Sequence, residues 1–312
     1  MKKVLVVGSK GMLGQELVSV FESDSDYGVS SWDRDDVDVT NKSEVVGKIE
    51  ELGPDVILNA AAYNAVDLCE DDEEEFEKAR DLNGLAPGYL AGVSKKIGAI
   101  FVHYSTDYVF GENMPEIPEP EGCTGSCGGC GLHEKFEPEV GFKEDDAAAP
   151  VNRYGESKLM GEKEVKKNGE KYYIVRLSKL FGKPAETEGA KRSFFDVMLE
   201  AGKNNDEVKA VDEETSCFTY APDLAKKTKE MVESKKDFGI YHIVNSDACT
   251  WYEAVMELYN QAGIETKITP VSGEEFDRPA KRPFYSVLIN KKLNPLRSYK
   301  EALAEYLKEI KK

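Results

Sequence analysis

The chain has 312 residues, 40% of them hydrophobic, and this length suits two domains or one large α/β unit with a satellite. The formal net charge of −18 argues against a nucleic-acid backbone as a partner, because proteins that bind nucleic acid concentrate Lys and Arg. The chain reaches Gly8 too early for a signal peptide and has no apolar run long enough to span a bilayer, so we expect a cytoplasmic protein with no membrane partner.

The first predicted elements are a strand, a glycine turn and a helix. Val4–Val7 form a continuous apolar run that leads into Gly8-Ser9-Lys10-Gly11-Met12-Leu13-Gly14, and Leu13, Leu17 and Phe21 then recur at helical spacing. Such a turn lets the backbone approach a pyrophosphate, and the helix N-terminus offers it unpaired N–H groups. The glycines are spaced G-x-x-G-x-x-G instead of the usual G-x-G-x-x-G, and a simple tight turn is the alternative. The position between strand and helix favours a dinucleotide site.

The second predicted strand, Val29–Trp32, ends in two residues that favour different cofactors. A doubly wound fold places the residue that meets the adenosine ribose at this point. Asp33 suits the free ribose hydroxyls of NAD, whereas Arg34 suits the 2′-phosphate of NADP. The sequence therefore leaves both NADH and NADPH open.

Strands and helices continue to alternate after this point. Asn41 and Glu44 form a capping pattern that opens a helix ending at Leu52, and Val56–Asn59 is the third predicted strand. Ala60-Ala61-Ala62-Tyr63 follows it. Small residues at the carboxyl end of a parallel strand leave room for a flat ligand, although helix packing would favour them equally.

The fourth predicted strand, over 99–105, ends in hydroxyl groups. An acidic run over 70–77, which fits a solvated helix face or a loop, and a helix over 85–93 precede it. The strand closes with Ser105-Thr106-Asp107-Tyr108. Hydroxyls at the carboxyl end of a parallel strand point into the crevice where such folds bind ligands.

A tyrosine and a lysine four residues apart form the candidate proton donor. On a helix, Tyr154 and Lys158 share one face. A lysine cation favours the phenolate and lowers the phenol's pKa from about 10, so that the phenol can act as a general acid nearer neutral pH. A solvated surface pair is the alternative. The glycine turn, Asp33 and Thr106 favour catalysis.

The remaining segments predict an α/β fold of the Rossmann type, with a doubly wound parallel sheet and a smaller C-terminal substrate lobe. A buried strand over 172–176 precedes an excursion near 193–202, and the strand over 208–211, the helix over 222–233 and the strand over 239–244 resume the alternation. We expect a dinucleotide-binding domain over 1–178 with an insertion over 112–140, an excursion over 179–204, a return over 205–248 and the substrate lobe over 249–312. Arg278, Lys281 and Arg282 could contact a nucleotide diphosphate or anchor a turn.

With these positions taken together, the chain resembles an extended short-chain dehydrogenase/reductase, and within that class the dTDP-4-dehydrorhamnose reductase family. The resemblance covers nearly the whole chain. It is carried by Asn59-Ala60-Ala61-Ala62-Tyr63, Ala65-Val66-Asp67, His103-Tyr104-Ser105-Thr106-Asp107-Tyr108-Val109-Phe110, Tyr154-Gly155-Glu156-Ser157-Lys158, Gly161-Glu162, Gly239-Ile240-Tyr241-His242, Thr250-Trp251-Tyr252 and Arg278-Pro279-Ala280-Lys281-Arg282-Pro283.

The resemblance implies that NADPH or NADH reduces the 4-keto group of a dTDP-4-dehydro-6-deoxy-L-hexose, converting dTDP-4-dehydrorhamnose to dTDP-L-rhamnose. Tyr154 would donate the proton, Thr106 would polarise the carbonyl oxygen, and Lys158 would hold the nicotinamide ribose. The implied cofactor contacts are Gly8, Lys10, Gly11, Met12, Leu13, Gly14, Asp33, Arg34, Asp38, Val39, Ala60, Ala61, Ala62, Tyr63, Tyr104, Tyr154 and Lys158. The implied substrate contacts are Ser105, Thr106, Asp107, Tyr108 and Arg282. Some family members are homodimers associated with Mg²⁺, so we also expect a homodimer and a Mg²⁺ site to which Glu16 could contribute.

Two alternative functions remain beside this one. Sugar-nucleotide 4,6-dehydratases follow the strand-end threonine with Asp-Glu, whereas this chain has Asp107-Tyr108. A non-catalytic NADP-binding protein, resembling the regulatory subunit of methionine adenosyltransferase, is the alternative from another class. Retention of Thr106, Tyr154 and Lys158 together favours an enzyme.

The segment between Gly111 and Gly141 departs from the family pattern. Cys123, Cys127, Cys130 and His133 have a spacing that suits a tetrahedral metal, and zinc is the first expectation. An iron–sulfur cluster and a metal-free loop are the alternatives. Two smaller departures lie elsewhere: Lys179 stands where relatives usually have a tryptophan, and Ser216-Cys217-Phe218-Thr219 replaces a turn with glycine and proline. They put the identity of the sugar in doubt.

Overall fold

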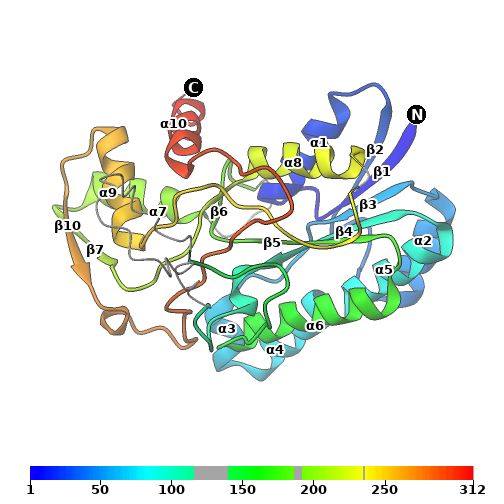
Figure 1. The fold of residues 1–312 in the computed structure, drawn as a ribbon, viewed down its shortest axis with the longest axis horizontal. Coiled ribbons are helices and arrows are strands. Elements are labelled where there is room, and N and C mark those ends of the chain that lie inside the picture. The colour runs from blue at the N-terminus through cyan, green and yellow to red at the C-terminus, as the bar shows by residue number, and fades with distance from the viewer. Residues whose placement is uncertain (116–139, 186–191, 235, 312) are drawn as a thin grey trace, which may run out of the picture.

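A computed structural model describes residues 1–115, 140–185, 192–234 and 236–311 (Figure 1). Within these residues, six parallel strands form the main sheet in the order β2-β1-β3-β4-β5-β9. Their bounds are Lys2–Val7 (β1), Tyr27–Trp32 (β2), Val56–Asn59 (β3), Ile100–Thr106 (β4), Tyr172–Leu177 (β5) and Gly239–His242 (β9). The predicted doubly wound α/β fold is confirmed.

The strand order creates a switch point between β1 and β3. The chain leaves β1 for β2 on one side and later places β3 on the other side of β1. In open α/β sheets, the crevice beside such a point, at the carboxyl ends of the strands, is where ligands bind. A ligand site is therefore expected at the loops that follow β1, β3 and β4.

Helices cover both faces of the sheet (Figure 1). One face carries α1 (Met12–Glu22) and α8 (Ala221–Glu233), whose apolar residues share one core cluster with strand residues. The other carries α2 (Lys42–Leu52), α5 (Ala86–Ile97) and α6 (Arg153–Asn168), which share a second cluster. The buried side chains of α1 are those that its apolar periodicity predicts, among them Leu13, Leu17 and Phe21.

Short elements lie between β3 and α5. They are α3 (Val66–Asp71), α4 (Glu73–Ala79) and a π-helix over Arg80–Leu85. The acidic run over 70–77 forms a largely solvated helical face, as the sequence predicts, and it also contacts α6. The Glu70 carboxylate accepts a hydrogen bond from the backbone N–H of Arg153 (3.0 Å), and Glu73 pairs with the Arg153 guanidinium (2.6 Å). These contacts tie the acidic helices to the start of α6.

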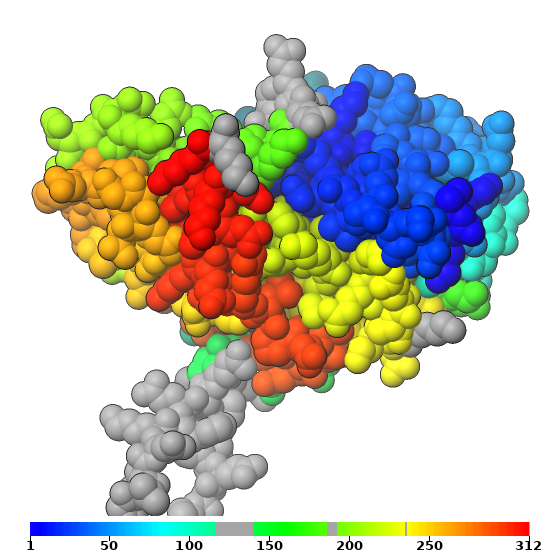
Figure 2. Space-filling model, turned by 90° about the horizontal axis from the view of Figure 1, so that it is seen from above, coloured from blue at the N-terminus to red at the C-terminus, as the bar shows by residue number. Residues whose placement is uncertain are grey.

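A second lobe has its own core, which combines aromatic and aliphatic residues from its helices, its strands and the adjoining loops. The elements of this part of the chain are β6 (Leu180–Phe181), α7 (Phe194–Asn204), β7 (Glu207–Val211), β8 (Thr219–Tyr220), α9 (Trp251–Ala262), β10 (Lys267–Val271) and α10 (Tyr299–Glu309), with 3₁₀ turns over Asp107–Val109 and Gly273–Glu275 elsewhere. Figure 2 shows the C-terminal residues, in red, between the orange part of this lobe and the blue and yellow parts of the sheet domain.

One strand is not where the sequence placed it. The sequence predicts that the strand over 208–211 resumes the α/β alternation within the return to the dinucleotide-binding domain, whereas β7 pairs in parallel with β10 in a separate two-stranded sheet. Its burial alternates, with Glu207 and Lys209 exposed and Val208 and Ala210 buried, whereas the interior strand β3 is buried at every position. An alternating strand suits a sheet with one solvated face. The division of the chain into domains at residues 178, 204 and 248 stays a prediction.

In the part of the chain that the structure describes, no helix is both long and apolar enough to cross a membrane.

Candidate active site

The glycine turn after β1 lies against the loop after β3. Gly8 has a φ of +79°, and a Cβ added there would lie 2.6 Å from the backbone nitrogen of Ala61. A Cβ on Gly14 would lie 2.1 Å from the carbonyl oxygen of Gly8, so α1 packs directly on the turn. Gly11 caps α1 without a side-chain hydrogen bond. The first N–H groups of this helix therefore face the crevice with no side-chain acceptor, as a pyrophosphate site requires.

Asp33 is anchored beside this turn. One of its carboxylate oxygens accepts a hydrogen bond from the backbone N–H of Lys10 (3.1 Å), and the other accepts from the backbone N–H of Arg34 (2.9 Å). The Lys10 ammonium pairs with Asp35 at 2.9 Å. The Arg34 side chain is exposed. The structure thus brings an acid and an exposed guanidinium to the carboxyl end of β2.

The other expected cofactor contacts frame the same crevice. Asp38 closes a turn by accepting from the backbone and hydroxyl of Thr40 (3.0 and 2.6 Å), and Val39 packs in the core beneath α2. The stretch after β3 has no regular structure up to Tyr63, whose hydroxyl donates to Glu75. The Met12 and Leu13 side chains belong to α1, with Leu13 in the core, so their backbone N–H groups are what they offer a ligand.

Backbone contacts set the position of α6. The Asn152 side chain caps the helix by accepting from the backbone N–H of Gly155 (2.8 Å). A Cβ on Gly155 would lie only 2.2 Å from the carbonyl oxygen of Tyr108, so the absence of a side chain lets the helix meet the end of β4. The adjacent Tyr154 is therefore held next to the residues that follow β4.

Thr106, Tyr154 and Lys158 meet at this junction. The Tyr154 hydroxyl lies 3.4 Å from the side-chain oxygen of Asn64 and within hydrogen-bonding reach of Thr106. The Lys158 ammonium donates to the carbonyl oxygen of Tyr104 (2.7 Å). The ring of Tyr104 points to the other face of the sheet, where its hydroxyl reaches Thr228, so only its carbonyl takes part here.

The expected effect of Lys158 on the phenol is not observed. Burial is the main cause that raises the pKa of Tyr154, the charge of Asp107 raises it further, and the hydrogen bond with Thr106 lowers it. Burial also lowers the pKa of the Lys158 ammonium to about 8, against the opposing charge of Glu162. Residues four apart share a helix face, but the Lys158 ammonium is directed to a backbone carbonyl, and burial sets the direction of the Tyr154 pKa. Tyr154 is therefore fully protonated at neutral pH.

Two of the expected substrate contacts face the protein interior. Asp107 is buried and accepts from the hydroxyls of Thr106 (3.1 Å), Ser178 (2.8 Å) and Ser286 (2.7 Å), although burial still raises its pKa. The Ser105 hydroxyl donates to Glu162 (2.7 Å), which forms a buried ion pair with Arg176. Both side chains have all their described contacts inside the protein. Ser105 and Asp107 are therefore not substrate contacts, and they position Thr106 and the strand end instead.

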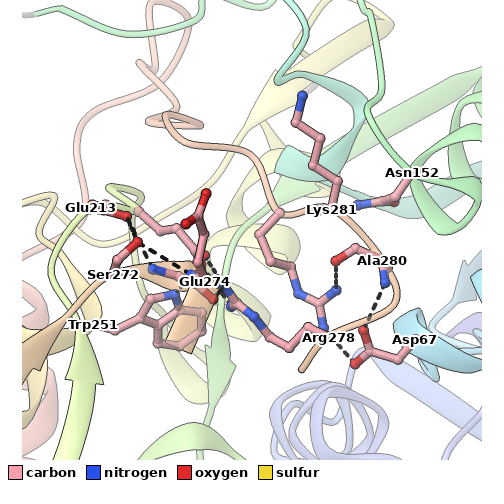
Figure 3. Close-up of polar contacts among 12 residues, drawn as sticks. Asp67, Asn152, Glu213, Trp251, Ser272, Glu274, Arg278, Ala280 and Lys281 are labelled. Atoms are coloured by element: carbon pink, nitrogen blue, oxygen red, sulfur yellow. Dashed lines mark hydrogen bonds and ion pairs between the residues drawn. The ribbon is translucent and has the colours of Figure 1, made fainter. Parts of the chain in front are cut away.

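The cations near the C-terminal lobe are mostly paired (Figure 3). Arg278 makes a two-point ion pair with Glu214, which also accepts from the Trp251 indole (2.9 Å). Arg282 pairs with Asp67 (2.7 Å) and donates to the carbonyl of Ala280 (2.7 Å). These contacts favour turn anchoring for Arg278 and Arg282. Figure 3 shows the Lys281 side chain extending away from both pairs, and its backbone carbonyl accepts from Asn152 (2.8 Å).

A small cavity adjoins the junction on the side of the second lobe. Its lining includes Tyr108, Lys179, Glu214, Ser216 and Trp251. The ring of Tyr108 meets that of Tyr154 edge to face, with centroids 5.9 Å apart. The cavity is therefore one aromatic ring away from the candidate proton donor.

The metal expectations find no support in the described residues. Cys123, Cys127, Cys130 and His133 lie outside the residues that the structure describes, so zinc binding stays a prediction. Among the described residues there is no group of three or more His, Cys, Asp or Glu side chains placed to hold a metal ion. Glu16 is half-buried near Glu309, Lys183 and Lys226, and burial is the main cause that raises its pKa. The described residues around Glu16 therefore do not support a Mg²⁺ site there.

Asn83 is a buried residue next to the site that the sequence pattern did not lead us to predict. It is fully buried in the π-helix, where its amide donates to the Tyr63 carbonyl (2.9 Å) and the Ser157 hydroxyl (3.1 Å) and accepts from the Tyr63 N–H (2.8 Å). It thereby links the loop after β3 to α6. A signal was present, because a lone amide stands between Leu82 and Leu85 in an otherwise apolar segment, and π-turns are frequent at functional sites.

A known protein family matches the whole of this chain. The family described as RmlD substrate binding domain matches residues 1–312. The Bacillus subtilis spore coat polysaccharide biosynthesis protein SpsK is 32% identical, with the match covering 99% of this chain and 98% of that protein. A dTDP-4-dehydrorhamnose reductase of Burkholderia thailandensis is 30% identical, over 93% of this chain and 91% of that protein.

Solved structures agree with the fold. A dTDP-4-dehydrorhamnose reductase of Clostridium acetobutylicum matches with a TM-score of 0.85 at 33% identity, over 99% of this chain and 100% of that chain. The reductase of Bacillus anthracis, solved in complex with NADP, matches with a TM-score of 0.84 at 30% identity, over the same shares of the two chains.

Proposed function

The chain belongs to the dTDP-4-dehydrorhamnose reductase family and is an oxidoreductase of that family, and on this premise we propose that it reduces the 4-keto group of a dTDP-4-dehydro-6-deoxy-L-hexose with NADPH or NADH. The convergence of Thr106, Tyr154 and Lys158 beside the switch point carries the proposal. The homodimer stays a prediction.

The residues around the glycine turn fit a dinucleotide. The close approach at Gly8 and Gly14 leaves no room for side chains, and the start of α1 presents backbone donors. Asp33 would hold the adenosine ribose, and Arg34 would reach a 2′-phosphate. The reduced nicotinamide, when bound, supplies the hydride.

The chain's own residues would manage the proton. Burial keeps Tyr154 protonated, so it is a proton donor at neutral pH. The Thr106 hydroxyl donates to Asp107 at 3.1 Å, and with substrate bound it would turn this one donor to the carbonyl oxygen and stabilise the negative charge that develops there. Lys158 has a pKa of about 8 and is therefore mostly charged at pH 7, where it would bind the nicotinamide ribose and stabilise the tyrosinate left after proton transfer.

The test follows the oxidation of NADPH by purified protein supplied with dTDP-4-dehydrorhamnose. Tyr154→Phe should lower turnover by about 10²- to 10⁴-fold while NADPH affinity, measured by fluorescence quenching, stays near that of the wild type. Tyr259→Phe, which removes a buried hydroxyl bonded to the carbonyl of Met198 in the second lobe, is the matched control and should keep its turnover. If Tyr154→Phe lost cofactor affinity but kept its turnover, the assigned roles would be wrong.

A further inference from the structure

Two polar groups in the cavity beside Tyr108 have no hydrogen-bond partner among the described residues. They are the Lys179 ammonium and the Ser216 hydroxyl, and neither atom is accessible to solvent. Buried donors without acceptors are rare in folded proteins, and each costs about 1–3 kcal/mol, more for a charged group. Two of them facing one cavity indicate a missing acceptor.

The surrounding carboxylates are already engaged. Glu214 is held by Arg278 and by the Trp251 indole. Asp107 is held by three hydroxyls, two of which belong to Ser178 and Ser286. Neither forms an ion pair with Lys179, whose pKa is lowered to about 8 by burial. The charges of Asp107 and Glu214 still favour the ammonium, but neither carboxylate gives it a hydrogen-bond acceptor.

Packing alone does not account for Lys179 either. Its ammonium lies 3.6 Å from the centroid of the Trp251 ring and 5.2 Å from that of Phe218, and a cation over an aromatic face is a favourable contact. Yet this contact leaves the N–H donors without an acceptor oxygen, and the backbone of Lys179 has a φ of +38°, where L residues are strained. An apolar side chain would fill the same space without the desolvation cost of an ammonium.

Ser216 is the second residue at this cavity whose side chain has no hydrogen-bond partner among the described residues. Its residue is 2% exposed, and its backbone pairs with Cys249, which holds it at the cavity wall. A hydroxyl donates and accepts, so it complements a group that carries oxygen. Trp251 also lines this cavity, whose volume of about 10 Å³ suits a single oxygen atom and not a whole sugar ring.

We propose that Lys179 and Ser216 form a subsite that binds a ring hydroxyl of the substrate's hexose, and so help to determine which sugar is reduced. The inference rests on the proposed function, because the cavity adjoins the proton donor Tyr154 through the ring of Tyr108. The group bound here is a sugar oxygen near the carbonyl carbon, and a diphosphate oxygen is the competing source of the same chemistry.

The test measures binding without turnover. Isothermal titration gives the Kd of dTDP-glucose, dTDP-xylose and dTDP for the wild type, Lys179→Met and Ser216→Ala. Lys203→Met makes the same chemical change at an exposed position on α7 and is the control. Thermal unfolding reports whether each variant folds.

Lys179→Met should weaken dTDP-glucose binding by roughly 10- to 100-fold, the effect of losing a charged hydrogen bond, and Ser216→Ala by a few-fold. Affinity for dTDP should stay unchanged in both. The loss should be equal with dTDP-xylose, which lacks carbon 6, because the bound oxygen belongs to a ring carbon. A loss with dTDP-glucose alone would place the oxygen on carbon 6, which carries none in a 6-deoxyhexose, and would contradict the inference.

Two further outcomes would overturn the inference. An equal loss of affinity for dTDP would assign Lys179 to the diphosphate, and unchanged affinity for every ligand would leave the cavity to a water molecule. The test also distinguishes failure of this inference from failure of the proposed function. If the wild type bound dTDP-glucose through Lys179 but failed to oxidise NADPH with the keto-sugar, only the proposed function would fail.

Discussion

Gly155→Ala tests whether the close contact between α6 and the residues after β4 positions the proton donor. The added Cβ would lie 2.2 Å from the carbonyl oxygen of Tyr108, so the helix must retreat by about 0.8 Å to restore a contact of 3.0 Å. The obstacle is a backbone oxygen, which cannot rotate away as a side chain can. Tyr154 is the adjacent residue and would move with the helix.

The expected effect separates activity from stability. Misplacing a catalytic group by about 1 Å costs on the order of 10²-fold in rate, so the kcat for NADPH oxidation should fall by roughly that factor. The clash costs about 1–3 kcal/mol, and alanine returns about 1 kcal/mol through its better helix propensity. Thermal unfolding should therefore shift far less than the activity.

Gly92→Ala is the matched control. This glycine lies in α5, and an added Cβ would have Asn168 at 3.9 Å as its nearest neighbour, which is ordinary contact. Its kcat should equal that of the wild type, and its stability should stay equal or rise by up to about 1 kcal/mol. A Gly155→Ala variant with the kcat of the wild type would refute the argument, because the phenol would then tolerate displacement of its helix.

The other predictions concern the lysine, the cofactor and the insertion. Lys158→Met should lower both turnover and NADPH affinity, and a loss of turnover alone would contradict its role on the ribose. Because the pKa of Lys158 falls from 10.5 to about 8 on folding, the unfolded chain binds more protons between these pH values, so urea titrations should show wild-type stability rising with pH relative to Lys158→Met. A difference that stays flat across this range would argue against a desolvated Lys158 with a lowered pKa. Asp33 beside Arg34 predicts use of both reductants, and a ratio of kcat/KM above roughly a thousandfold, more than about 4 kcal/mol, would count against it. Elemental analysis should find about one zinc per chain, lost in Cys127→Ser/Cys130→Ser with most reductase activity kept, whereas iron with visible absorbance would indicate a cluster.

Local sequence was enough for the elements whose signals are local. Val56–Asn59 is a strand with the bounds that its apolar run predicts, and the helix opened by Asn41 ends at Leu52 as expected. The side chain of Asn41 accepts from the backbone N–H of Glu44 (3.3 Å), as its capping pattern requires. Such features depend on residues within one helical turn or one strand, so periodicity and capping chemistry reveal them.

The candidate site was partly predictable for the same reason. The spacing of Tyr154 and Lys158 places them on one helix, and Thr106 follows from its position at the end of an apolar strand. Their meeting depends on the parallel sheet, whose strand ends share one edge. The sequence pattern therefore indicated the residues, and the order of the strands brought them together.

Tertiary structure alone decided burial, pairing and charge. Asp107 takes its partners from Ser178 and Ser286, the latter 179 residues away, and Ser105 turns to Glu162, so no local pattern could show that both face inward. The direction of the Tyr154 pKa likewise reversed, because desolvation is set by everything that packs around the phenol and a neighbouring lysine is only one part of it. The unpaired Lys179 shows the same dependence: its sequence position marks a departure, but only the surrounding side chains reveal a buried ammonium without an acceptor.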